Sequence, residues 1–173
     1  NNSVRWLHNF TWPRNVMQHF KRQMKTWTKY GLFNALLGLV IGIFIAITSI
    51  GDGYFVFGIA APIAAFLTGG LLWKFLVKDT LYHSKIFITG LLTGTISHYI
   101  TFVLISIGMN ICYWTTGNCT GSLGDPPASI VNMLTGAFAF SFFSLLFLGW
   151  LTIAYSIIIG LILKRIENRK NVA

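Results

Sequence analysis

Long apolar stretches alternate with short polar segments along the chain. Four of these stretches lie at about 31–50, 53–73, 86–111 and 130–163. Each is long enough to cross the hydrocarbon core of a bilayer, which takes roughly 20 helical residues. Because backbone polar groups in lipid need hydrogen-bond partners within the protein, the stretches are expected to be α-helices. The pattern predicts an all-α integral membrane protein with four transmembrane helices.

The fourth stretch is longer than one crossing requires. A helix over 130–163 would be about 51 Å long at ~1.5 Å per residue. We expect this helix to tilt, to kink near Gly149 or to project from the bilayer. Two crossings would instead place Lys164 and Arg165 on the opposite side from the other basic residues, so one long helix is preferred.

The first 30 residues have a different pattern, in which aromatic and basic residues are interleaved. From Pro13 onward, apolar side chains at Val16, Phe20, Met24 and Trp27 recur at helical spacing. A basic amphipathic helix of this kind is typical of the membrane interface, where it is a positional anchor or a docking surface for a partner or an anionic lipid. The residues expected to anchor it are Trp6, Trp12, Arg14, Lys21, Arg22, Lys25 and Trp27.

The positive charges are confined to three places. The 173-residue chain is 10% charged, yet it has 13 Lys and Arg residues and a formal net charge of +9. Because basic loops stay on the cytoplasmic or matrix side, we predict an interfacial segment 1–30, a transmembrane domain 31–163 and a basic tail 164–173, with both termini inside. Cations beside apolar spans predict contact with the lipid bilayer, not with nucleic acid. The bacterial cytoplasmic membrane is expected, with the mitochondrial inner membrane as the alternative.

Small residues recur at helix-packing spacing in the first three stretches. Two Gly-x-x-x-Gly motifs occur, and further small residues surround Pro62. Such residues let helix backbones approach closely, because dispersion contacts drive helix association in lipid. Packing within this chain is preferred to docking of a partner subunit. The candidate helix-packing or partner-contact residues are Gly38, Gly42, Gly58, Ala61, Gly90 and Gly94.

The spans contain almost no ionisable residues, which argues against ion-driven transport. His98, near the middle of the third stretch, is the exception, and with Tyr99 it forms the candidate intramembrane polar site. Contact with a haem or quinone is the less favoured alternative, since His8, His19 and His83 lie too near the ends to supply a second buried haem ligand. A neutral His98 bonded to a Ser or Thr of a neighbouring helix is preferred. No cofactor and no metal site are predicted.

The two cysteines follow the third stretch. Cys112 and Cys119 are candidates for a structural disulfide if the outer side is oxidising. A single Cys-x6-Cys lacks the Cys-x-x-Cys and the second pair that quinone-linked thiol oxidases carry. The sequence also has no P-loop, no Ser-His-Asp set and no zinc cluster. No catalytic residue is assigned, and a protein that is not an enzyme is favoured.

Four functional hypotheses remain open. The preferred one is a non-catalytic accessory or scaffold subunit, bound to other membrane subunits or to copies of itself. The main alternative is a small oligomeric transporter or permease component, with a path lined by Ser, Thr, Asn and His98. The other two are a lipid- or quinone-handling enzyme centred on His98 and Tyr99, and a protein of the bacteriocin-immunity kind, which fits the topology alone.

Overall fold

The protein is built from helices that cross a membrane. The computed structural model describes residues 14–49, 54–77, 82–120 and 124–170, and no strand occurs in these ranges. Within these ranges, four helical segments are long and apolar enough to span a bilayer, which indicates an integral membrane protein. The elements are α1 (Arg14–Thr48), the 3-10 turn η1 (Tyr54–Val56), α2 (Phe57–Leu76), α3 (His83–Thr116), α4 (Ile130–Ser144), the π-helix η2 (Leu145–Gly149) and α5 (Trp150–Lys170).

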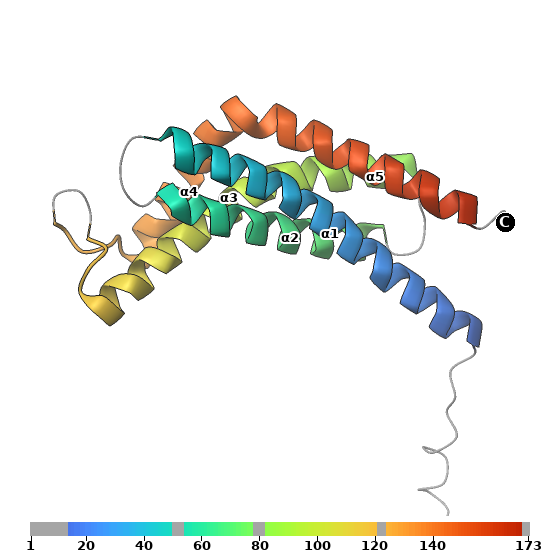
Figure 1. Cartoon of the computed structure of the whole chain (residues 1–173), viewed down its shortest axis with the longest axis horizontal. Coiled ribbons are helices and arrows are strands. Elements are labelled where there is room, and N and C mark those ends of the chain that lie inside the picture. Colours follow the sequence, from blue (N-terminus) through green and yellow to red (C-terminus); the bar gives the residue numbers. More distant parts are fainter. Residues whose placement is uncertain (1–13, 50–53, 78–81, 121–123, 171–173) are drawn as a thin grey trace, which may run out of the picture.

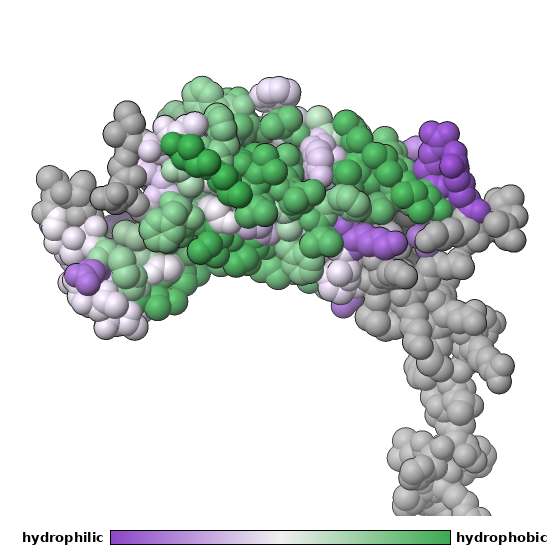
Figure 2. All heavy atoms as spheres, viewed as in Figure 1, coloured by the Kyte–Doolittle hydropathy of each residue, from purple (hydrophilic) through white to green (hydrophobic). Residues whose placement is uncertain are grey.

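The helices form an antiparallel bundle. α2 pairs along its length with the second part of α1, while α3 packs against both α2 and α5 (Figure 1). The start of α1 and the end of α5 lie at the same end of the bundle, as an even number of crossings requires. Hydrophobic side chains cover the middle of the visible face, and hydrophilic ones gather at its two ends (Figure 2). Assignment of the basic end to the inner side stays a prediction based on charge.

The first helix joins the basic segment to the first crossing without a break. α1 is continuous from Arg14 to Thr48, and its residues Thr26–Thr48 are long and apolar enough to span a membrane. Trp27, expected as an interfacial anchor, packs against α2, with its ring centre 6.4 Å from that of Phe66. Gly70 leaves the room for this indole ring, because a Cβ there would lie 3.0 Å from it. Of the other expected anchors, Trp6 and Trp12 lie outside the described ranges. The remaining ones belong to the part of α1 before residue 26: Arg14, Lys21, Arg22 and Lys25.

The fourth span contains a π-helix at the point where a kink was expected. α4, η2 and α5 form one uninterrupted helical segment, and the chain changes direction at η2 (Figure 1). A π-turn closes i→i+5 hydrogen bonds and so holds one residue more than an α-turn, which bends the helix. Gly149 is the last residue of η2 and is buried.

All four glycines of the Gly-x-x-x-Gly motifs lie against helices of the same chain. A Cβ on Gly38 or Gly42 would come within 3.0 Å of the backbone of α2. A Cβ on Gly90 or Gly94 would do the same at the backbone of α5. These glycines therefore set the close approach of α1 to α2 and of α3 to α5. Backbone atoms of Gly58 and Ala61 in α2 lie against Gly42 and Gly38, whereas a Cβ on Gly58 itself would have no atom within 4 Å.

The interior has an apolar end and a polar middle. Towards the basic end, a buried cluster contains Tyr30, Trp73, Val77, Ile86 and Leu163. The rings of Tyr30 and Trp73 lie 4.5 Å apart between their centres. Beyond this cluster, many of the side chains between the helices carry hydroxyl or amide groups. These polar side chains line a cavity.

Candidate functional site: a polar cavity inside the bundle

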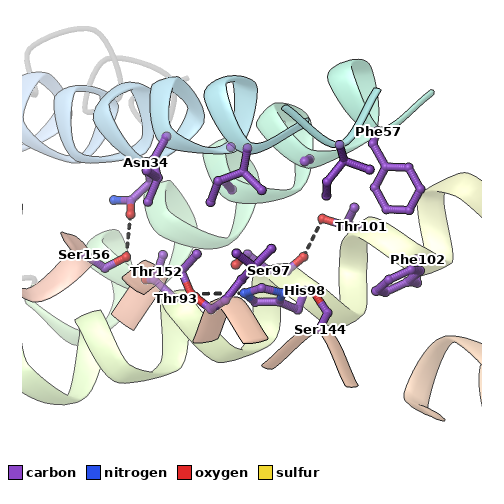
Figure 3. Close-up of a pocket in the computed structure, with 17 residues that line it drawn as sticks. Asn34, Phe57, Thr93, Ser97, His98, Thr101, Phe102, Ser144, Thr152 and Ser156 are labelled. Carbon is purple, nitrogen blue, oxygen red and sulfur yellow. Dashed lines mark hydrogen bonds between the residues drawn. The ribbon is translucent and has the colours of Figure 1, made fainter. Parts of the chain in front are cut away.

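A cavity of about 60 Å³ lies in the middle of the bundle, and residues of every crossing line it. Its lining is mixed: aliphatic side chains come mainly from α1, and most of the polar ones come from α3 and the fourth crossing (Figure 3). No Lys, Arg, Asp or Glu is among the described residues that line it. The polar lining residues are Asn34, Thr93, Ser97, His98, Thr101, Ser144, Thr152 and Ser156.

Most of the α3 contribution comes from a stripe of hydroxyl residues. Thr89, Thr93, Ser97 and Thr101 follow one another at intervals of four, so they share one face of the helix. Three of them line the cavity, and Thr89 continues the stripe towards the basic end. This spacing is visible in the sequence, but the polar site that we predicted from the sequence contained His98 and Tyr99 and not the hydroxyl stripe. A search for polar residues at helical spacing would have found this face.

His98 joins α3 to the fourth crossing through both of its ring nitrogens. Nδ1 lies 2.7 Å from the Ser144 hydroxyl, and Nε2 lies 3.0 Å from the Thr152 hydroxyl. Thr152 has carbonyl acceptors at Gly94 (3.3 Å) and Gly149 (3.1 Å) for its single proton. If Thr152 donates to a carbonyl, its oxygen accepts from Nε2–H, and Nδ1 then accepts from Ser144. We therefore assign His98 as the neutral Nε2–H tautomer, which satisfies all three side chains.

The π-helix places both partners of His98 on one face. Ser144 and Thr152 are eight residues apart, which in a regular α-helix would put them about 80° apart around the axis. The extra residue held in η2 makes the interval equivalent to seven, about 20° short of two full turns. Both hydroxyls therefore reach the same imidazole ring. Helical periodicity in a sequence is counted on regular helix geometry, so it could not predict this pairing.

A second polar cluster borders the cavity on the side of the basic end. The Ser156 hydroxyl donates to Asn34 Oδ1 at 2.6 Å, and Asn34 Nδ2 donates to the Tyr30 carbonyl at 2.9 Å. The Tyr30 hydroxyl donates to the Ser156 carbonyl at 3.2 Å. These bonds link α1 to α5, and they leave the Asn34 amide with one further N–H.

One buried hydroxyl of the lining has no hydrogen-bond partner within bonding distance among the described residues. Thr93 is 1% exposed, and its Oγ1 makes no hydrogen bond to any described residue, although the Tyr30 hydroxyl is a near neighbour. A buried hydroxyl without a partner is costly, since it has given up its bonds to water. Its position at the cavity wall means that a molecule inside the cavity can supply the missing bond.

The remaining candidate residues lie elsewhere. Tyr99 follows His98 at about 100° around the helix axis and does not line the cavity. Cys112 and Cys119 form a disulfide that closes the end of α3 onto the following loop, with Cα atoms 6.0 Å apart.

No further group beside His98 in the described part of the chain would complete a haem or metal site. Within the described ranges, no three His, Cys, Asp or Glu residues are grouped closely enough to hold a metal ion. His83 is about 22 Å from His98 along α3, at 1.5 Å per residue, and its Nδ1 lies 3.1 Å from Lys164 Nζ. The fit is therefore poor for a bis-histidine haem.

Comparison of this chain with protein families, curated proteins and solved structures found no match. The cavity and its residues are thus the basis for a functional proposal.

Proposed function

We propose that this protein is a small membrane permease component that provides a path for a small polar solute. The observation that carries the proposal is the cavity at mid-bundle, which residues of all four crossings line, with hydroxyl and amide groups from α1, α3 and the fourth crossing. Polar groups are costly in lipid and mark solute pathways when they face an internal cavity. The bacterial cytoplasmic membrane, with the basic end inside, is the proposed location.

The chemistry of the lining favours a facilitator over an ion-coupled carrier. None of the described lining residues carries a carboxylate, so no acidic group among them can bind and release a driving proton or cation. Aromatic side chains stand at the end away from the basic residues: the ring centre of Phe102 lies 5.7 Å from those of Phe57 and Phe140. In the proposed path, these rings separate the cavity from the outer side, and Tyr30 with Trp73 separates it from the inner side.

A cysteine at the cavity tests whether water reaches it. We expect Ser97→Cys to react with methyl methanethiosulfonate in proteoliposomes much faster than Leu91→Cys, which lies on the exposed face of α3. The reacting species is the thiolate, which forms in a hydrated site and is suppressed in hydrocarbon. The native cysteines are joined in a disulfide and give no background. Equal, slow labelling of both folded variants in intact-mass spectra would refute the proposed path.

An accessory-subunit role is the second candidate, and one observation favours it. α4 packs mainly against α3, and large side chains from α4, η2 and the start of α5 are exposed, which a neighbouring membrane subunit or a second copy could cover as well as lipid. The exposed residues are Phe138, Phe142, Phe143, Phe147 and Trp150.

Native mass spectrometry tests this second role. If the protein is a subunit, purification from its own membrane in mild detergent is expected to yield a stoichiometric complex with unrelated chains. The extended apolar face of α4 would then be protected from hydrogen exchange or crosslinked to the partner. Recovery of the chain alone, or only with copies of itself, counts against the subunit hypothesis and leaves the permease proposal standing.

A further inference from the structure

We infer that the cavity binds a small neutral molecule that donates hydrogen bonds, of the size of water or ammonia. This inference rests on the proposed function and adds the class of solute. It follows from three properties of the cavity: its volume, its lack of charge, and the way in which the hydroxyl protons of its walls are already used.

The volume indicates the size of solute that fits inside the cavity. The cavity measures about 60 Å³. An apolar cavity of roughly 150 Å³ accommodates benzene, whereas a water molecule needs only about 10–15 Å³ measured in the same way. The site therefore has room for a few water molecules or one molecule of a few heavy atoms. Sugars, amino acids and nucleotides are too large for the cavity as it stands.

The absence of charge excludes ionic solutes. No charged side chain is found among the described residues of the lining. An ion placed there would lose its hydration without gaining a counter-charge, at a cost far above that of a neutral polar molecule. The ionisable side chain of the lining is His98, and both of its nitrogens are already bonded to Ser144 and Thr152. The neutral form of a solute such as ammonia is therefore the form that fits.

The hydrogen bonds already made leave several hydroxyl lone pairs free to accept bonds at the cavity, beside the Thr93 hydroxyl and one Asn34 N–H as donors. The Thr101 hydroxyl donates to the Ser97 carbonyl at 2.7 Å, and Ser156 donates to Asn34. In the assigned tautomer, Ser144 donates to His98. Each hydroxyl oxygen keeps a lone pair after donating its proton, so these groups can accept hydrogen bonds from a solute. A molecule rich in N–H or O–H donors matches this wall.

Thr93 provides an independent observation at the same place. Its Oγ1 is the buried lining hydroxyl without a hydrogen-bond partner among the described residues. A bound molecule that accepts from this hydroxyl and donates to Thr101 or Ser144 would satisfy it. Water and ammonia each combine donors with at least one acceptor. Figure 3 shows Thr93 on the same side of the cavity as His98 and Thr152.

Flux measurements on isosteric variants test the solute class. In proteoliposomes of the full chain, we expect faster osmotic water exchange or faster ammonia entry than in empty vesicles, and no increase for glycerol. Thr93→Val should lower the protein-dependent flux about three- to tenfold, because a hydrogen bond to the solute is lost. Its thermal unfolding temperature should not fall, since Thr93 Oγ1 makes no hydrogen bond to the described residues that could be lost.

Two comparisons make the outcome decisive. Thr95→Val removes a hydroxyl on the same helix that does not line the cavity and bonds to the Leu91 carbonyl, so its flux should equal that of the unmodified protein. Entry of glycerol, or absence of water and ammonia flux while Ser97→Cys is labelled, would overturn the solute class but keep the proposed path. Absence of both flux and labelling would overturn both.

Discussion

Gly94→Ala is expected to destabilise the protein strongly. A Cβ on Gly94 would lie 2.7 Å from both the backbone nitrogen and the Cα of Ile153, so α5 would have to move away from α3. Overpacking of this kind costs about 1–3 kcal/mol. Separation of the two helices would also stretch the 3.0 Å contact between His98 and Thr152. The free energy of unfolding, measured by denaturant titration in mixed micelles, should fall by this amount.

Two other helical glycines supply the matched control. A Cβ on Gly108 or Gly136 would have no atom within 4 Å. The same substitution there should leave the stability unchanged, or raise it by up to about 1 kcal/mol, because alanine favours the helix more than glycine does. If Gly94→Ala were as stable as Gly136→Ala, the close contact between α3 and α5 would be wrong.

His98→Ala is the second substitution with a large expected effect. It removes the acceptor of the Ser144 hydroxyl and the donor to Thr152, which together connect α3 to both ends of η2. Interhelical hydrogen bonds in membrane proteins average about 0.6 kcal/mol, with a maximum near 1.7 kcal/mol. The substitution also enlarges the cavity, which destabilises the protein further. We therefore expect the free energy of unfolding to fall by roughly 2–3 kcal/mol.

A double-mutant cycle separates the hydrogen bonds from the loss of volume. His98→Ala and Thr152→Val should be coupled by about 0.6–1.7 kcal/mol, since each removes the same contact. His83→Ala, at an exposed position at the start of α3, should have little effect. An uncoupled pair, or a His98→Ala protein as stable as the unmodified one, would contradict the role of His98 in joining α3 to the fourth crossing.

The number and type of crossings could be predicted from the chain because lipid imposes them. Any segment as apolar and as long as 86–111 has to satisfy its backbone internally, whatever its neighbours are. The disulfide between Cys112 and Cys119 was also foreseeable, since a short loop joins the only two cysteines. Helix ends were less predictable: α3 continues to Thr116, because polar residues at the membrane boundary are compatible with helix as well as with loop.

The partners of His98 show what could not be predicted. The sequence placed this residue near the middle of the third crossing and favoured a bond to a Ser or Thr on a neighbouring helix. Which hydroxyls those are depends on the π-turn η2, whose extra residue rotates Thr152 into line with Ser144. Likewise, Thr93 has no hydrogen-bond partner for its hydroxyl among the described residues because of how the helices pack around it. No local sequence pattern predicts this.

The sequence by itself thus determined the membrane class, the four crossings and the separation of basic from apolar segments, because these depend on the free energy of transferring each segment into lipid. The tertiary structure decided which glycines face which helices and where the polar side chains meet. Those features depend on helix rotation and register, which are fixed by contacts between segments far apart in the chain.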